Sequence, residues 1–164
     1  RLNYAKELVS VACPTVIKGN ISECKAFYGM TSHAHGVDAD IQDEEDIYES
    51  CKWLKDMALN LGCVVVCSGK IDVVTDGKEV NLISNGCDML SRITGTGCML
   101  NVAIATFLAS YSPLLACIKA TCYYEVAAEK TKSEGPGTFH MHFMDEIYKL
   151  TSFDESLFKI EVLE

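Results

Sequence analysis

Two glycines alternate with two threonines at residues 94–98, where the sequence reads Thr-Gly-Thr-Gly-Cys directly before a long apolar stretch. Glycine lets the backbone approach a ligand closely, and the first N–H groups of a helix attract anions because they lack an intrahelical partner. Such N–H groups would stabilise the charge that spreads over phosphoryl oxygens during transfer. A tight turn that only leads into a helix has the same composition, so the spacing alone leaves both interpretations open. The signatures G-x-x-x-x-G-K-[ST] and G-x-G-x-x-G are absent.

Cys98 follows the second glycine, at the predicted start of this helix. A helix N-terminus favours the thiolate form of cysteine, and a thiolate could accept a proton as a general base. Alternatively, Cys98 only shapes the pocket, and the neighbouring N–H groups supply most of the stabilisation. Both interpretations place Cys98 at a reacting centre.

Two H-x-H pairs are the remaining candidates for metal chemistry: His33 with His35, and His140 with His142. No further ligands accompany either pair, so solvated loop histidines are the default interpretation. The acidic run 38–46 lacks the glycine and the terminal glutamate of an EF-hand. The nine cysteines form no C-x-x-C pair, and their odd number does not fit a disulfide framework. We therefore expect most of them to be small buried hydrophobic residues.

The charge balance of the chain limits its partners. The 164 residues include 23 acidic and 14 basic ones, for a net charge of -9, and 49% of them are hydrophobic. Such a chain can bury a core, but it repels phosphate backbones and acidic membranes, so nucleic acid and membrane are not expected as partners. The start is charged and differs from a signal peptide, and the apolar stretches are short for a spanning helix. We expect a cytoplasmic protein.

Helical and extended patterns alternate along the chain. We expect a short helix capped by Ser22, a C-terminal glycine cap at Gly62, and a hairpin turn at Asp76 and Gly77. This order predicts an α/β fold, in which ligands bind at the carboxyl ends of the strands. The predicted helices are 2–11, 22–28, 43–61, 98–110, 113–132 and 141–150, and the predicted strands are 15–18, 63–67, 73–75, 80–83 and 160–162.

Five blocks resemble the hydroxyethylthiazole kinases, which belong to the ribokinase-like superfamily, and they occur in the order of that family. They are residues 16–23, 36–39, 66–74, 93–100 and 135–139. The resemblance implies a three-layer ribokinase-like fold with a mostly parallel sheet flanked by helices. It also implies a single domain over residues 1–164 that is truncated, with the N-terminal strands of the family missing.

The resemblance also implies roles for individual residues. Glu23 would organise magnesium, and Lys18, Asn20 and Ser68 would contact ATP. Gly95 would line the substrate site, while Gly97 and Cys98 would form the catalytic anion hole. Lys18 stands where the family often has arginine, so it keeps the charge without the bidentate fork. Cys98 stands where the wider superfamily usually has aspartate.

The activity implied by the resemblance is ATP- and Mg²⁺-dependent phosphorylation of the hydroxyl of 4-methyl-5-(2-hydroxyethyl)thiazole, in thiamine biosynthesis or salvage. The resemblance also implies a homotrimer, provided that the N-terminal part is present. Other ribokinase-like activities, such as hydroxymethylpyrimidine kinase, are disfavoured by Cys98. Because family members are longer, a different class also stays open, namely a non-catalytic nucleotide-binding remnant or assembly module.

Overall fold

The computed structural model describes residues 2–30, 47–149 and 154–163, and the chain separates into two compact units. Unit 1 comprises Arg1–Leu82 and Glu161–Glu164, and unit 2 comprises Ile83–Ile160. Each unit is described by itself below, and the single domain over residues 1–164 stays a prediction. Within the described ranges, no helix combines the length and the apolar character that crossing a bilayer requires.

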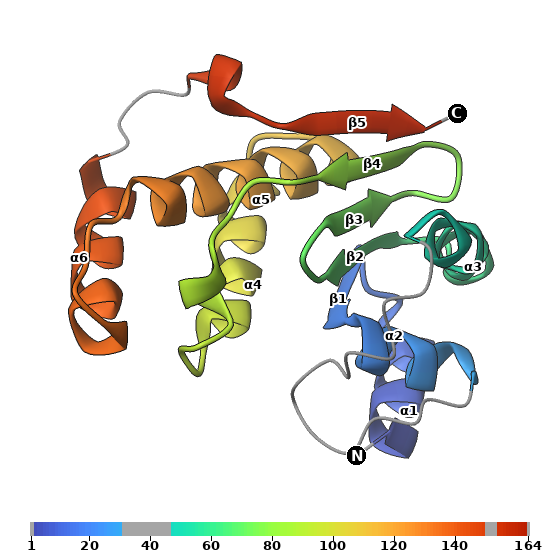
Figure 1. Cartoon of the computed structure of the whole chain (residues 1–164). Helices are drawn as coiled ribbons and strands as arrows, with labels where there is room; N and C mark the ends of the chain where they lie inside the picture. Colours follow the sequence, from blue (N-terminus) through green and yellow to red (C-terminus); the bar gives the residue numbers. More distant parts are fainter. Residues whose placement is uncertain (1, 31–46, 150–153, 164) are drawn as a thin grey trace. The chain divides into compact units, whose positions relative to one another are not determined.

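The elements alternate as expected for an α/β fold (Figure 1). In chain order they are α1 (Leu2–Ala12), β1 (Val16–Asn20), α2 (Ile21–Tyr28), α3 (Ile47–Leu61), β2 (Val64–Ser68), β3 (Asp72–Thr75), β4 (Val80–Ile83), α4 (Thr96–Phe107), α5 (Pro113–Lys130), α6 (Pro136–Lys149) and β5 (Ile160–Leu163), with 3₁₀ helices at Asp88–Leu90 and Glu155–Leu157. The predicted helix start at residue 43 and the block 36–39 lie outside the described residues.

The five strands form one mixed sheet in the order β1-β2-β3-β4-β5. β1 and β2 are parallel, with Val16 paired to Val64 and Asn20 paired to Ser68, whereas β2 and β3 are antiparallel. The parallel register therefore brings the carboxyl ends of β1 and β2 to the same edge of the sheet. β5 lies at the end of this order, which confirms the predicted edge strand.

The core of unit 1 lies between one face of the sheet and helices α2 and α3. Cys63, directly before β2, and Val65 and Cys67 within it alternate along the chain and pack with Leu54 and Met57 of α3. The intervening residues of β2 are buried as well, as expected for a strand with an unbroken apolar sequence. The buried cysteines confirm that most thiols serve here as small hydrophobic groups.

The starts of three helices differ from the sequence-based expectation, and one of them is α4, which begins at Thr96 and not at residue 98. The N-cap of α2 is Asn20 and not Ser22, because Asn20 and Glu23 form a reciprocal capping box. α6 begins at Pro136 and not near residue 141, since proline fits the first helical position and the Phe139 amide already donates to the Gly135 carbonyl. By contrast, Gly62 follows α3 in the left-handed conformation, as predicted.

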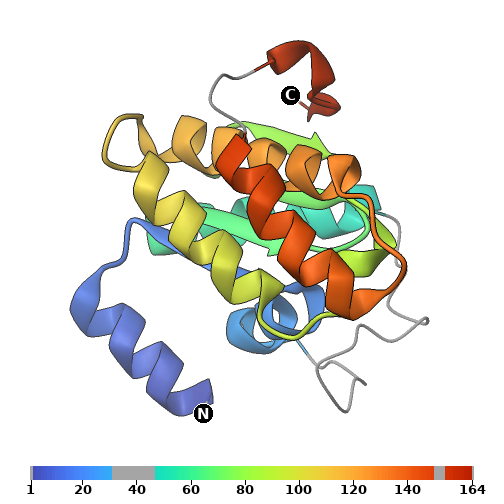
Figure 2. The ribbon, with the colours of Figure 1, turned by 90° about the vertical axis from the view of Figure 1, so that its left-hand side faces the viewer.

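Unit 2 is built around α5, which contacts both α4 and α6 (Figure 2). Ala116, Ala120 and Ala127 of α5 are fully buried, so small side chains let the neighbouring helices approach closely. An aromatic cluster joins α5 to α6, because the ring of Tyr124 packs edge-on against Phe143, which stacks on Phe139. This helical unit holds the start of α4, where the sequence places the anion site.

Candidate functional site

The start of α4 has the geometry of an anion-binding turn. Gly95 is the N-cap, with φ 100° and ψ -10°, and its side-chain position borders open space. The first intrahelical hydrogen bond is donated by the Met99 amide to the Gly95 carbonyl, 2.9 Å away. The amides of Thr96, Gly97 and Cys98 precede that bond, so they have no acceptor within the helix. They are therefore placed to receive an anion together with the positive end of the helix dipole.

Thr96 closes the turn through its side chain. Its hydroxyl oxygen lies 2.8 Å from the Leu90 carbonyl and 3.2 Å from the Ile93 carbonyl. Its own carbonyl accepts a hydrogen bond from the Tyr124 hydroxyl at 2.8 Å. Sequence patterns assigned no functional role to Tyr124, because an aromatic residue within a helical pattern is indistinguishable from any other core residue.

Cys98 is exposed, whereas Cys117 and Cys122 of the same unit are buried. Burial raises the pKa of Cys117 to about 12, so this thiol stays protonated at neutral pH. The three predicted residues of the turn, Gly95, Gly97 and Cys98, lie within four consecutive positions of unit 2. In this unit, Cys98 is the thiol that a ligand at the α4 N-terminus could meet.

The residues assigned to the nucleotide and the cation lie together in unit 1. Asn20 and Ser68 are direct partners in the parallel register and end their strands side by side. The Ser68 hydroxyl lies 3.4 Å from the Gly19 carbonyl, and Lys18 is one position further back on β1. Glu23 joins them across the start of α2. This is the edge of the sheet at which α/β folds bind their ligands.

Glu23 and Asn20 already perform a structural task. The Asn20 amide donates to Glu23 Oε2 at 2.8 Å, and the Glu23 amide donates to Asn20 Oδ1 at 2.8 Å. The spacing N-x-x-E is itself a capping-box signature, so this role could have been found from the sequence. The box engages one carboxylate oxygen, and a carboxylate has a second oxygen that can face a cation.

The donor set around Glu23 fits magnesium better than a transition metal. Within the ranges that the structure describes, no three His, Cys, Asp or Glu side chains gather as a metal site. Glu23 contributes one carboxylate at this edge of the sheet. Mg²⁺ commonly binds through one or two carboxylates together with water and substrate phosphates, so the residues present fit this ion.

Gly19 keeps the backbone of β1 close to α2. A Cβ atom at this position would lie 3.1 Å from Glu23 Cβ and 3.3 Å from Cys24 Sγ. Beneath it, a hydrogen bond with the buried Cys24 thiol, together with desolvation by burial, raises the pKa of Cys67. A side chain at position 19 would therefore press on Glu23, which would have to shift by a few tenths of an ångström in the capping box.

The block at residues 135–139 has a structural explanation within unit 2. The Thr138 hydroxyl lies 3.2 Å from the Glu134 amide and 3.1 Å from the Gly135 carbonyl, which fixes the first turn of α6. Phe139 is 1% exposed and stacks on Phe143. This block therefore anchors α6 in the core of the unit.

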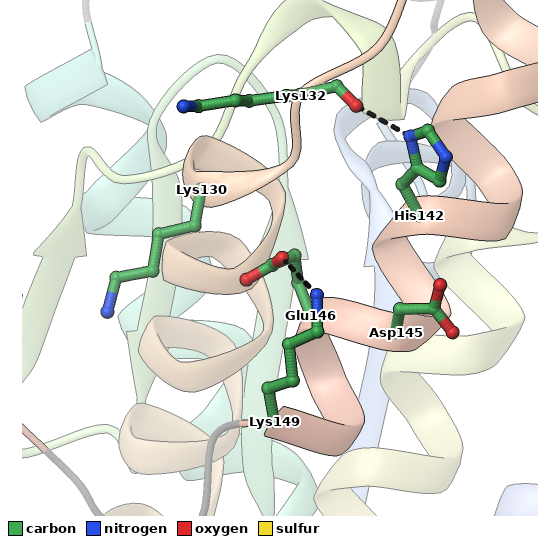
Figure 3. A pocket seen from close by; sticks show the side chains of 6 residues that line it. All are labelled: Lys130, Lys132, His142, Asp145, Glu146 and Lys149. Atoms are coloured by element: carbon green, nitrogen blue, oxygen red, sulfur yellow. Dashed lines mark hydrogen bonds and ion pairs between the residues drawn. The ribbon is translucent and has the colours of Figure 1, made fainter.

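A surface pocket lies between the end of α5 and α6, and its lining is mixed in charge (Figure 3). It is lined by Lys130, Lys132, His142, Asp145, Glu146 and Lys149. His142 Nδ1 lies 2.7 Å from the Lys132 carbonyl oxygen, so this nitrogen carries the proton, and Lys149 pairs with Glu146 at 3.0 Å. Of the residues considered in the sequence analysis, His142 lines this pocket, where it links α6 to the segment that follows α5.

Comparison with known proteins identifies the relatives of the chain. The profile of the hydroxyethylthiazole kinase family matches residues 1–153. "Hydroxyethylthiazole kinase 2" from Clostridium botulinum (strain Langeland) is 39% identical over 92% of this chain and 58% of its own length. "Hydroxyethylthiazole kinase" from Pyrococcus furiosus is 37% identical and covers the whole chain, which spans 62% of that relative. The chain thus corresponds to a C-terminal part of the family's length.

Solved structures agree with the sequence relatives. The structure of the hydroxyethylthiazole kinase protein from Pyrococcus horikoshii superposes with a TM-score of 0.83 and 28% identity, over 99% of this chain and 60% of that one. The pyridoxal kinase from Staphylococcus aureus superposes with a TM-score of 0.61 at 21% identity, over the whole of this chain and 57% of that one, which supports the fold alone. The predicted ribokinase-like α/β fold is thereby confirmed. By profile, sequence and structure, the chain belongs to the hydroxyethylthiazole kinase family.

Proposed function

We propose that this chain forms the phosphoryl-transfer part of an enzyme that phosphorylates the hydroxyl of 4-methyl-5-(2-hydroxyethyl)thiazole with ATP, in cytoplasmic thiamine biosynthesis or salvage. The observation that carries the proposal is the start of α4, where a left-handed Gly95 borders open space and three consecutive amides lack an acceptor within the helix. Membership in the family supports the choice of substrate.

The N–H groups at this turn would hold the phosphoryl group during transfer. Negative charge accumulates on the oxygens of that group, and amides oriented in advance stabilise it without reorganisation. In this proposal the Gly97 amide points at the migrating group, and Gly95 leaves room for the thiazole alcohol. The exposed thiol of Cys98 lies one residue further along the same helical turn.

The reaction exchanges one P–O bond for another. The substrate hydroxyl oxygen forms a bond to the γ-phosphorus, and the bond from that phosphorus to the β–γ bridging oxygen breaks, which releases ADP. The hydroxyl proton passes to the Cys98 thiolate or to water. In a loose transition state, positioning and charge stabilisation lower the barrier more than a general base does. The main contribution of Cys98 is therefore its position beside the reacting groups.

Residues at the ends of β1 and β2 would bind the nucleotide. The ammonium group of Lys18 would attract the phosphates through its positive charge. Ser68 and Asn20 would supply hydrogen-bonding groups at neighbouring strand ends. Glu23 would face Mg²⁺ through the carboxylate oxygen that the capping box does not use. When bound, Mg²⁺ neutralises part of the charge on the phosphates.

Turnover by the purified chain tests the proposal directly. The chain is mixed with ATP, Mg²⁺ and the thiazole alcohol, and the formation of ADP and thiazole phosphate is followed by chromatography. Because the chain spans 58% of a relative's length, the assay is repeated with the preceding segment of that relative added as a separate polypeptide. Light scattering in both samples tests for the homotrimer.

The two samples separate the candidate functions. Thiazole phosphate in either sample supports the kinase. Nucleotide binding without product in both samples contradicts it and favours the non-catalytic nucleotide-binding module.

A further inference from the structure

The peptide unit between Thr96 and Gly97 links the interior of unit 2 to the proposed anion site. A trans peptide is planar, so its C=O and N–H groups point in opposite directions from the same rigid plane. The carbonyl of this unit belongs to Thr96, and the N–H belongs to Gly97. Any group that fixes the direction of the Thr96 carbonyl therefore also fixes the direction of the Gly97 amide.

Tyr124 is that group. Its hydroxyl donates a hydrogen bond to the Thr96 carbonyl oxygen at 2.8 Å, across 28 residues of sequence. A carbonyl within a helix ordinarily accepts a bond from the amide four residues further on, so the tyrosine supplies an additional donor from outside the helix. The bond comes from α5, the central helix of the unit.

The tyrosine ring is held in place by its neighbours. Tyr124 is 3% exposed, and its ring meets Phe143 edge-on with a centroid distance of 4.8 Å and an interplanar angle of 81°. Phe143 in turn stacks on Phe139 at 5.5 Å, and both are fully buried. Since rotamer changes in such a cluster would open a void, the hydroxyl is fixed in direction as well as in position.

The side chain of Thr96 is fixed as well as its carbonyl. Its hydroxyl reaches the carbonyl oxygens of Leu90 and Ile93, in the segment that precedes the turn. Thr96 is thus fixed at both its side chain and its carbonyl. The peptide plane that follows it has little freedom to rotate.

A hydrogen bond to a carbonyl also polarises its peptide group, which makes the N–H on the other side a stronger donor. The tyrosine keeps its proton for this purpose, because desolvation and the nearby Glu125 carboxylate raise the pKa of Tyr124 well above its usual range. The contact therefore orients the Gly97 amide and strengthens it as a donor.

We propose that Tyr124 is a positioning residue for phosphoryl transfer, which directs the Gly97 amide into the anion site through the Thr96 carbonyl. The inference rests on the proposed function for its kinetic test, and on the geometry of unit 2 alone for its binding test. Tyr124 touches neither substrate nor phosphate in this scheme, and it acts through one peptide plane.

The test compares Tyr124→Phe with Tyr123→Phe. The first substitution removes the hydroxyl and keeps the ring against Phe143. The second is the matched control, since the Tyr123 hydroxyl also donates to a backbone carbonyl, that of Ile147 at 2.9 Å, away from the turn. Circular dichroism first establishes that both variants are folded, and all measurements are made below both melting temperatures.

In the kinetic test, Tyr124→Phe is expected to lower kcat about tenfold, as the loss of one oriented hydrogen bond would. The KM of the thiazole alcohol should change less than about twofold, because the substrate itself loses no contact. Tyr123→Phe should match the unchanged chain. Equal kcat values in all three proteins, or the same loss in both variants, would overturn the inference.

A binding test keeps the inference falsifiable if the chain shows no turnover and the proposed function fails. Inorganic phosphate is titrated against the ¹⁵N-labelled chain, and the amide resonance of Gly97 is followed by NMR. We expect a phosphate-dependent shift at Gly97 whose apparent Kd weakens about tenfold in Tyr124→Phe and stays unchanged in Tyr123→Phe. No shift at Gly97 in the unchanged chain, or identical Kd values in both variants, would refute the positioning role.

Discussion

Single side chains in this protein combine structural contacts with the chemical roles that we propose for them. Thr96 closes a turn with its hydroxyl, and its carbonyl receives the Tyr124 hydroxyl. Glu23 completes a capping box at the same edge of the sheet where the nucleotide is proposed to bind. Cys98 differs from both, because it is exposed and its side chain caps nothing. A substitution at Cys98 therefore reports on chemistry with little effect on folding.

Replacing Cys98 with alanine is expected to lower the turnover of thiazole phosphorylation about 100-fold, as for loss of a group that accepts a proton in the transition state. The KM for ATP should stay within about twofold, because the nucleotide contacts are assigned to unit 1. Steady-state kinetics at saturating alcohol measures both quantities. Cys13→Ser, at the other exposed thiol, serves as the control. Full turnover in Cys98→Ala would remove this residue from the catalytic set.

At the scale of elements, helix and strand ends determine where the candidate residues lie. The parallel register of β1 and β2 places Asn20 opposite Ser68, and Gly95 sets the first residue of α4. In unit 1, the turn between β3 and β4 fixes the antiparallel side of the sheet, and it packs against α3 through Gly77. These ends depend on glycines in left-handed conformations and on side chains that cap backbone amides.

Gly77→Ala is expected to destabilise the protein by about 2–4 kcal/mol, because two effects combine. Gly77 has φ 89°, and a Cβ atom there would lie 2.5 Å from Leu59 Cγ and 2.9 Å from the Leu59 backbone nitrogen. Gly62→Ala is the matched control, since Gly62 has φ 63° but borders open space. It should cost only about 1 kcal/mol for the left-handed backbone. Urea unfolding of both variants measures the difference, and equal losses would exclude the steric contribution.

Asp76 makes the same turn sensitive to acid. Burial acts to raise the pKa of Asp76, but hydrogen bonds from the Glu79 and Lys78 amides to Oδ1 outweigh it, so the pKa is lowered. A lowered pKa in the folded state means that the stabilisation is present above the unfolded value of 3.8 and is lost as the pH falls through the folded value.

The unfolding free energy of Asp76→Asn should therefore lie below that of the unchanged protein by about 0.5–1 kcal/mol at pH 5 to 7, as for loss of a charge-assisted hydrogen bond. The gap should close below about pH 4. Urea unfolding across this range measures it, and a gap that is independent of pH would contradict the assignment to the charge of Asp76.

The sequence predicted those features that depend on local chemistry. The glycine turn before α4, the glycine cap of α3, the hairpin at Asp76 and the buried strand β2 follow from residue types and periodicity. The capping box was not predicted, because Ser22 also fits an N-cap, although the N-x-x-E spacing of Asn20 and Glu23 indicates it. The role of Tyr124 could not be predicted, because its contact with Thr96 joins two helices and leaves no periodic pattern.

At the scale of the whole molecule, the open question is cooperativity between the two units. Each has its own core: α2, α3 and the sheet in unit 1, and α4, α5 and α6 in unit 2. Buried cysteines occur in both units. Cys24, Cys51, Cys63 and Cys67 are buried in unit 1, and Cys117 and Cys122 are buried in unit 2.

If residues 1–164 form one domain, as we predict, all six buried thiols should become reactive at the same urea concentration. Pulsed alkylation followed by mass spectrometry of peptides measures each thiol separately. The exposed Cys13 and Cys98 should react without urea and provide the internal reference. Separate midpoints for the thiols of the two units would show two independently folding parts.

The reciprocal hydrogen bonds between Asn20 and Glu23 affect the choice of substitutions at Glu23. If Glu23 both begins α2 and faces Mg²⁺, as we propose, its loss would change the stability of the helix and the binding of the ion together. Alanine at Glu23 would unsettle the helix as well as the ion, whereas glutamine retains an oxygen for the Asn20 amide and removes only the charge. A substitution that keeps the shape of the Glu23 side chain therefore separates the contribution of its charge from its part in the helix cap.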